Sequence, residues 1–368
     1  MRGAWLLVGV VACGGLRASA QPPPVIGLPV EPAAPSGPPV EVPSVLPAEQ
    51  PAPRPEEPPR PRRDDFGIGG FGGFGAGGAT GAPGYNAAYY PTRPTGGGGT
   101  DLGLVRQNLS FGAPVWRDGG DALILTGAVR NTVFFTDAVL PASRRPFPDT
   151  LWNVNLGLAY THKFENGWTA GGTVGVGSAS DKPFNSINEM TANVSAFLRV
   201  PARNDRDSWM FGVFYSPVGN LNFPVPIVAY LWNPSDRLRV NIGLPFSVTW
   251  RPTDDLTLSF SYVPVVNVNA RVTYRVAERV SVFGGFEWLN EAYLLANRAD
   301  DRDRFLVLEK RLLGGVRWDV WERGAVEFNA GYAFDREFGV GRNATGNLRD
   351  RVDVDPGAFL GVSLRLRF

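Results

Sequence analysis

The 368-residue chain has one cysteine, Cys13, and one histidine, His162. With so few thiol and imidazole groups it cannot build a disulfide framework, a cysteine-based redox site or an ordinary zinc site. We interpret His162 as a polar residue near the end of a strand. No serine lies in the strand–turn–helix context of a hydrolase nucleophile. We therefore expect no metal, no cofactor, no catalytic residues and no enzymatic activity.

Neither sign of charge dominates, because 36 lysines and arginines stand against 35 aspartates and glutamates. This balance gives no reason to expect a nucleic-acid partner. After the N-terminal segment the chain also lacks any run of 18 apolar residues. Residence in a membrane would therefore have to use strands, since a helical span needs about 20 apolar residues.

The first twenty residues, "MRGAWLLVGVVACGGLRASA", carry one early arginine, an apolar run and then Ala18-Ser19-Ala20. This pattern is typical of a secretory signal peptide cleaved after Ala20. A second interpretation remains open, because "VVAC" at residues 10–13 resembles a lipobox. In that case Cys13 would be acylated.

Two low-complexity segments follow. Residues 21–65 are rich in proline, with 16 prolines in residues 21–63, and we expect a disordered, extended spacer of polyproline II type. Residues 66–100 are rich in glycine, as in "FGIGGFGGFGAGG", and we expect a flexible linker. Together these segments predict a disordered Pro/Gly-rich arm.

From residue 101 to residue 368 apolar and polar residues alternate. In "LWNVNLGLAYTHK", residues 151–163, every second residue from Trp152 to Tyr160 is apolar, while Asn153, Asn155, Thr161 and Lys163 fall on the opposite face. A period of two predicts β-strands. Residues 101–368 are therefore expected to form an all-β domain.

The connections fall into two classes. Short connections rich in Asn, Asp, Gly or Pro lie at 164–168, 204–207, 233–236, 252–255, 276–279 and 321–324, and longer polar stretches lie at 137–149, 180–187, 290–304 and 335–352. Tight turns at one end and long loops at the other are typical of an outer-membrane barrel, with the turns facing the periplasm. Seven aromatic residues lie close to the short turns and predict an interface girdle there: Trp168, Trp209, Trp232, Trp250, Tyr274, Trp318 and Trp321.

The last strand, "GAFLGVSLRLRF", places Leu364, Leu366 and Phe368 on one face and Arg365 and Arg367 on the other. An apolar residue at every second place and a terminal Phe resemble the assembly signal of Gram-negative outer-membrane, porin-like β-barrel proteins. The resemblance implies contact with outer-membrane lipid and recognition by the barrel-assembly machinery. A secreted β-sandwich would also alternate, but the loop classes, the rim aromatics and this terminus favour the barrel.

Fifteen strand candidates can be counted between residues 102 and 368, but a single-chain bacterial barrel has an even number of strands. We therefore predict an antiparallel transmembrane β-barrel of about 14 strands, within a range of 12–16. We expect that something at its N-terminal end, around 102–113, is not an ordinary wall strand. The two short pieces within 236–252 are also doubtful as full crossings.

The face opposite the apolar one should line the interior. The pore-lining candidates are Arg130, Arg199, Arg239, Arg271, Arg311, Arg317, Glu309, Glu327, Arg365 and Arg367. An excess of arginine would favour anions. Alternatively, glutamates and loop aspartates pair with these arginines and only keep the interior rigid.

Two functions follow from these expectations. The first is a passive or weakly selective channel in the bacterial outer membrane for small hydrophilic solutes, anions among them. The second is a structural anchor, whose arm (residues 21–100) binds a periplasmic or cell-wall partner. For the channel, we expect Arg365→Ala to leave assembly unchanged and to change only which solutes pass through the pore. In both cases we expect Phe368→Ala to impair assembly.

Overall fold

The computed structural model describes residues 83–96, 99–204, 206–218, 223–264, 267–344 and 346–366. The signal peptide, the proline-rich spacer, Cys13, Arg367 and Phe368 lie outside the described residues. No helix in the described part of the chain is long and apolar enough to cross a membrane.

The described residues form seventeen strands and one 3-10 turn, η2 (Ile187–Glu189). The strands are β1 (Gly84–Pro94), β2 (Asp101–Asp118), β3 (Asp121–Thr136), β4 (Thr150–Lys163), β5 (Thr169–Ser180), β6 (Met190–Pro201), β7 (Ser208–Tyr215), β8 (Val225–Ser235), β9 (Leu238–Gly243), β10 (Phe246–Trp250), β11 (Leu256–Val263), β12 (Asn267–Ala277), β13 (Val280–Tyr293), β14 (Arg304–Trp321), β15 (Gly324–Gly341), β16 (Arg349–Val354) and β17 (Gly357–Leu366).

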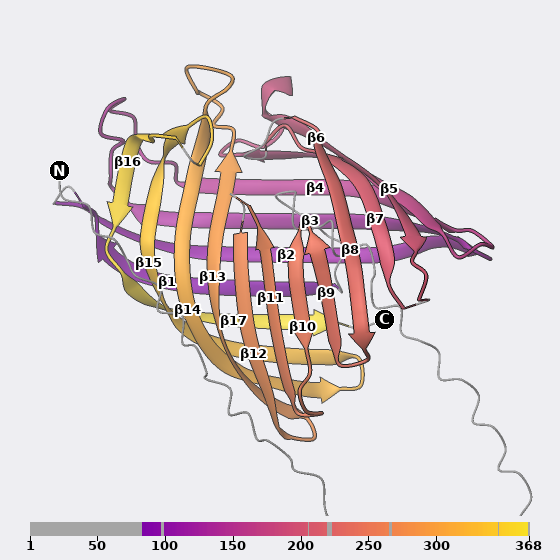
Figure 1. The fold of residues 1–368 in the computed structure, drawn as a ribbon. Helices are drawn as coiled ribbons and strands as arrows, with labels where there is room; N and C mark the ends of the chain where they lie inside the picture. Colours follow the sequence, from indigo (N-terminus) through magenta and orange to yellow (C-terminus); the bar gives the residue numbers. More distant parts are fainter. Residues whose placement is uncertain are drawn as a thin grey trace, which may run out of the picture. The chain divides into compact units, whose positions relative to one another are not determined.

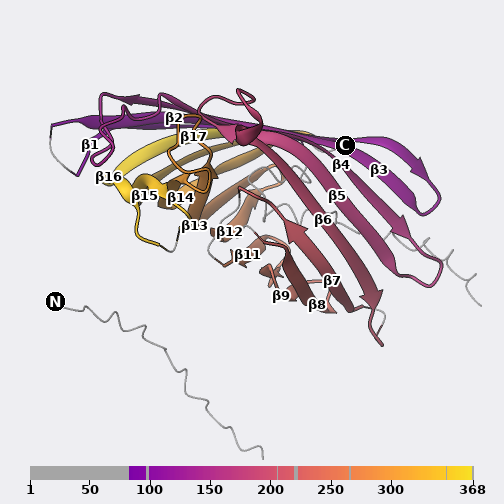
Figure 2. The same ribbon diagram turned by 90° about the horizontal axis from the view of Figure 1, so that it is seen from above.

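Sixteen of these strands close into an antiparallel barrel. Each strand from β2 to β15 pairs with its neighbours in sequence, β15 pairs with β17, and β1 lies between β17 and β2 (Figures 1 and 2). The seventeenth strand, β16, pairs with the loop end of β15, and its Val354 also bridges Thr95 just after β1, but it is not one of the sixteen strands of the ring. The predicted all-β antiparallel barrel is confirmed, with sixteen strands in place of about fourteen.

The N-terminal end of the barrel differs from the expectation. All fifteen candidate segments are strands of the wall, including 102–113, which lies in the ordinary wall strand β2. The missing sixteenth strand is β1, so the barrel starts at Gly84 and not at residue 101. The sequence "GYNAAYYPTRP" lies among glycine- and proline-rich residues, and for this reason it was not predicted as a strand. Pairing on both of its edges, with β17 and with β2, stabilises it as one.

The barrel has a loop end and a turn end. The longer connections β3–β4, β5–β6 and β13–β14 lie at the loop end (Figure 1, top), and the tight turns lie at the opposite, turn end. Side chains alternate between the two faces. On β4, for example, Leu151, Asn153 and Ala159 are buried inside, and Leu156 and Leu158 are exposed outside.

Strand length varies strongly around the ring. We call β2, β3, β14 and β15 the tall wall, because they have 16–18 residues, and β7–β11 the low wall, because they have 5–11 residues. At about 3.3 Å per residue an 18-residue strand is about 60 Å long and a six-residue strand about 20 Å. The apolar band of such barrels is about 25 Å tall. The tall wall therefore rises beyond the band at the loop end, and β9 and β10 are as short as the sequence indicated.

Candidate functional site: a capped lumen

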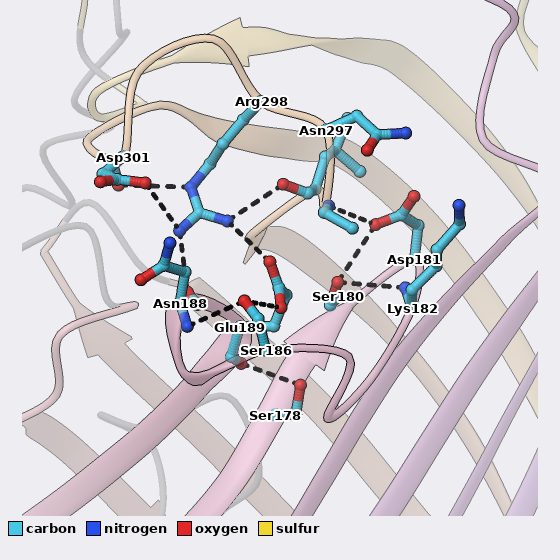
Figure 3. Close-up of polar contacts among 12 residues, drawn as sticks. Ser178, Ser180, Asp181, Lys182, Ser186, Asn188, Glu189, Asn297, Arg298 and Asp301 are labelled. Carbon is cyan, nitrogen blue, oxygen red and sulfur yellow. Dashed lines mark hydrogen bonds and ion pairs between the residues drawn. The ribbon is translucent and has the colours of Figure 1, made fainter.

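The loop between β13 and β14 (residues 294–303) reaches across the loop end to the loop between β5 and β6. Arg298 is its main contact, since its Nη2 donates to the carbonyl of Asn188 at 2.8 Å and its Nη1 lies 3.4 Å from Oε1 of Glu189 (Figure 3). Both charged side chains are at most 7% exposed. We call this contact the Arg298–Glu189 latch.

Neighbouring groups hold both halves of the latch. Ser186 Oγ donates to Oε2 of Glu189 at 2.6 Å, and Asp181 Oδ1 accepts from the backbone N–H of Ala296 at 2.8 Å (Figure 3). Burial raises the pKa of Glu189, but the hydrogen bonds from Ser186 and the charge of Arg298 outweigh it and lower that pKa below its usual value. Glu189 is therefore an ionised carboxylate at neutral pH.

The same loop also contacts other parts of the loop end. Arg145 of the β3–β4 loop donates to the carbonyl of Asn297, Asp303 pairs with Arg349 at 2.5 Å, and Arg304 Nη2 donates to the carbonyl of Pro217 at 2.6 Å. Residues 294–303, together with Arg304 at the start of β14, thus join the β3–β4, β5–β6 and β7–β8 loops and β16. We call this assembly the cap.

An apolar layer lies beneath the cap. The rings of Phe134, Phe147, Phe305 and Phe338 meet edge to face with centroids 5.1–5.6 Å apart. They belong to a larger buried cluster that includes Leu306, which is fully buried. Aromatic edge-to-face contacts and full burial are features of a protein core. The loop end of the barrel beside the tall wall is therefore filled.

A layer of charge follows the apolar layer. Glu309 is 1% exposed; its Oε1 accepts from the hydroxyl of Tyr90 at 2.9 Å and lies 3.4 Å from Nη1 of Arg106, and its Oε2 lies 3.5 Å from Nε of Arg336. Arg311 in turn donates to the Tyr90 hydroxyl at 2.9 Å. We call these residues the Glu309 network. Buried charges need such partners, because an unpaired one is costly.

Two more carboxylates extend this layer across the barrel. Glu287 pairs with Arg311 on the neighbouring strand. Glu291 pairs with Arg130 at 2.5 Å and accepts from the hydroxyl of Tyr293 at 2.9 Å. Arg130 lies on β3 and Glu291 on β13, so this ion pair bridges the lumen between strands that are not neighbours.

The turn half of the lumen is polar. Glu327, 2% exposed, is contacted by Arg271 at 3.2 Å, Arg317 at 3.1 Å and Arg365 at 3.5 Å, and Arg317 also pairs with Asp319. Three guanidinium groups therefore share two carboxylates. This half carries a surplus of positive charge, in contrast with the filled half above it.

The structure brings most of the predicted lining residues together in these two layers. Arg130, Arg311 and Glu309 lie in the upper layer, and Arg271, Arg317, Glu327 and Arg365 lie in the lower one. Arg199 stands apart and donates to Ser208 Oγ at 2.8 Å, and Arg239 lines a recess on β9 and β10. Arg367 lies outside the described residues.

The sequence analysis missed several residues of the site, among them Tyr90, Arg106, Glu291, Arg298 and Arg336. Arg106 could have been found by extending the alternation of β2. Arg336 could not, because a bulge opposite Glu309, with φ of 48° at Asp335, shifts the alternation of β15 by one residue. Glu291 lies in a stretch expected to be loop, and Arg298 lies in a loop without periodicity.

The outer surface carries the other predicted features. All seven girdle aromatics, Trp168, Trp209, Trp232, Trp250, Tyr274, Trp318 and Trp321, are 40–51% exposed and lie at or next to the turn end of the wall. On β17, Leu360 and Val362 are exposed, and Leu364 and Leu366 follow in the same alternation. Phe368 lies outside the described residues, so its role as an assembly signal stays a prediction.

A closed antiparallel barrel of sixteen strands, with an apolar outer surface and a polar interior half, is a transmembrane β-barrel. This architecture places the protein in the bacterial outer membrane. The chain belongs to the family described as a domain of unknown function (DUF6268), whose model matches residues 141–365.

Other comparisons give distant likenesses only. No curated protein matches the chain. Among solved structures, it is similar to the β domain of the Bordetella autotransporter Brka (11% identity, 78% of this chain and 99% of that chain covered, TM-score 0.28) and to OccK7 of Pseudomonas aeruginosa (14%, 77% and 97%, 0.33). The COG4313 outer membrane channel from Pseudomonas putida F1 gives 10% identity, 77% and 95% coverage and a TM-score of 0.27. Likenesses of this size carry no argument about function.

Proposed function

We propose that the protein is an outer-membrane channel for small anionic solutes, closed at its loop end by the cap. The observation that carries this proposal is the polar turn half of a sixteen-strand barrel, where three arginines share two carboxylates. Barrels of this strand number are wide enough to leave an aqueous path. A surplus of guanidinium groups along such a path focuses positive potential and favours anions.

Conduction requires the cap to move, because its loops join across the loop end of the barrel, where the apolar layer and the Glu309 network already fill the space beside the tall wall. The Arg298–Glu189 latch is the first contact to break, since it joins two loops and carries no wall pairing. Opening the latch would free residues 294–303 from the opposite side of the lumen. The strands of the wall would keep their pairing.

Single-channel recording on the purified full chain in planar bilayers tests the proposal. We expect rare openings in the wild type and frequent openings in Arg298→Gln and Glu189→Gln, with a reversal potential that indicates anion preference. Acidification should act like Glu189→Gln once the pH falls through the lowered pKa of Glu189. Lys310→Gln is the control, because it removes an exposed ion pair with Asp335 on the outer face of the barrel. No conductance from the wild type or from either latch variant would contradict the channel.

A second candidate function is an anchor for an arm that binds a periplasmic or cell-wall partner. The packed cap favours it, and so does β1, which begins at the turn end and pairs on both edges. Deleting residues 21–82 leaves β1 intact and separates the two functions. Unchanged conductance with a weakened cell envelope would favour the anchor, and unchanged envelope strength would contradict it.

We also propose that the barrel-assembly machinery recognises the C-terminal strand.

A further inference from the structure

A recess lies on the inner face of the hairpin β9–β10, in the turn half of the lumen. Alternate positions of both strands line it: Arg237, Arg239 and Asn241 on β9 and just before it, and Ser247, Thr249 and Arg251 on β10 and just after it. Cross-strand pairing places Arg239 opposite Thr249, and Asn241 opposite Ser247. The other face of the hairpin points outward, since Ile242 and Trp250 are 49% and 47% exposed.

Two acidic groups lie near the recess. Asp236 lines the rim, but its side chain is 96% exposed and pairs with Arg206 at 3.2 Å. Asp254 in the following turn pairs with Arg237 at 2.9 Å. The seven described lining residues include three arginines and one aspartate, and Asp254 compensates the charge of Arg237. Arginine side chains therefore outnumber carboxylates around the recess.

The size and the polar groups of the recess define what fits. Its volume is about 170 Å³, well below the roughly 300 Å³ at which pockets for drug-sized ligands begin. Guanidinium groups bind oxyanions through paired N–H donors, and the hydroxyls of Ser247 and Thr249 can donate beside them. Asn241, 5% exposed, donates to the carbonyl of Pro245 at 2.7 Å and is held in place as the floor.

We propose that this recess is a binding site for one small oxyanion of the phosphate or sulfate type, held by Arg239 and Arg251 with Ser247 and Thr249. The site deepens the proposed channel function and rests on it for its role, because an oxyanion held there would lie on the solute path at the turn end. Binding itself does not require conduction. The two can therefore be measured separately.

Isothermal titration of the detergent-solubilised full chain with inorganic phosphate and with sulfate tests the site. We expect saturable binding that is weakened at least tenfold in the double variant Arg239→Gln/Arg251→Gln. The matched control is Arg279→Gln, which removes the same charge from the β12–β13 turn outside the recess and should change the affinity less than twofold. The heat-dependent shift on a gel shows that each variant is folded.

Each outcome decides the proposal. No saturable binding to the wild type, or equal binding to the double variant, overturns it. Binding of glycerol phosphate alone, without inorganic phosphate, would overturn the assignment to a free oxyanion and indicate a lipid headgroup. Binding in a protein that never conducts would refute the channel and leave the site, whereas anion conduction without binding would leave the channel and refute the site.

Discussion

The tall wall and the low wall bury different things on their inner faces. The tall wall holds the Glu309 network and the layer of phenylalanines, with Glu309 and Phe338 at most 1% exposed. The low wall buries a small apolar cluster, Met210, Phe214, Ile227, Ala229 and Val263, and below it the polar recess. The inner face of one barrel can therefore be a protein core beside the tall wall and a lumen lining beside the low wall.

Strand length explains the difference. Where the tall wall rises beyond the apolar band, strands from opposite sides face each other and the loops fold between them, so a core of packed rings and paired charges can form. Where β9 and β10 end early, no wall stands above them. The inner faces of β7 and β8 are apolar at that level, and Leu244 in the short β9–β10 loop packs against them. β7 and β8 are therefore apolar on both faces, because their inner side chains pack in this cluster and their outer side chains are exposed on the outer surface.

The largest effect is expected in the Glu309 network. Glu309→Ala leaves Arg106, Arg336 and Arg311 without their shared carboxylate, and removing one partner of a buried pair costs about 3–5 kcal/mol. The free energy of unfolding in urea, measured on refolded protein in lipid vesicles, checks this. Glu309→Gln keeps the shape of the side chain but removes its charge, and it should also lower the free energy of unfolding. A loss below about 1 kcal/mol for both variants would show that the tall wall is not a core.

An intermediate effect is expected at the turn end of the low wall, where Asp207 is 4% exposed. Its carboxylate accepts from Tyr230 Oη, Asn204 Nδ2 and the backbone N–H of Asn233, each at 2.7 Å. Burial raises the pKa of Asp207, but these hydrogen bonds outweigh it and lower that pKa below the usual value. Asp207→Asn should cost about 2 kcal/mol at pH 7.

The pH dependence of that cost follows from the sign of the shift. Because the folded-state pKa is lowered, the stabilisation is complete above the unfolded pKa of about 3.9 and is lost as the pH falls through the folded value. Unfolding curves of the wild type and of Asp207→Asn should therefore differ at pH 7 and converge as the pH falls below the lowered folded-state pKa of Asp207. A difference that stays constant with pH would contradict this account.

The smallest effect is expected at the ion pair between Arg237 and Asp254, 57% and 85% exposed on the turns of the low wall. Exposed pairs contribute about 0–1 kcal/mol. Asp254→Asn should thus change the free energy of unfolding by less than about 0.5 kcal/mol in the same assay. A loss as large as that of Glu309→Ala would remove the distinction between the two walls.

The alternation in the sequence was enough to find fifteen of the sixteen wall strands and the orientation of their side chains, because period two is a local property. It was also enough to place Arg311 and Glu327 inside. It could not show which charges meet, since the pair of Arg130 with Glu291 joins strands 161 residues apart in the chain. It also could not show the hydrogen bond of Tyr90 to Glu309, because that contact depends on closure of the barrel. The Arg298–Glu189 latch could not be predicted either, because it depends on the conformation of two loops.

The position of β1 has a consequence for the order of folding. Tyr85 on β1 pairs with Leu364 on β17, 279 residues later in the chain, and on its other side with Leu109. Contacts that distant form late, because chain entropy opposes them. Until the last strand arrives, the β1–β2 hairpin and β17 are open edges that could pair with other chains. The pairing of β1 with β17 is therefore the last strand pairing of the ring to form. When it forms, Tyr90 on β1 comes within hydrogen-bond distance of Glu309.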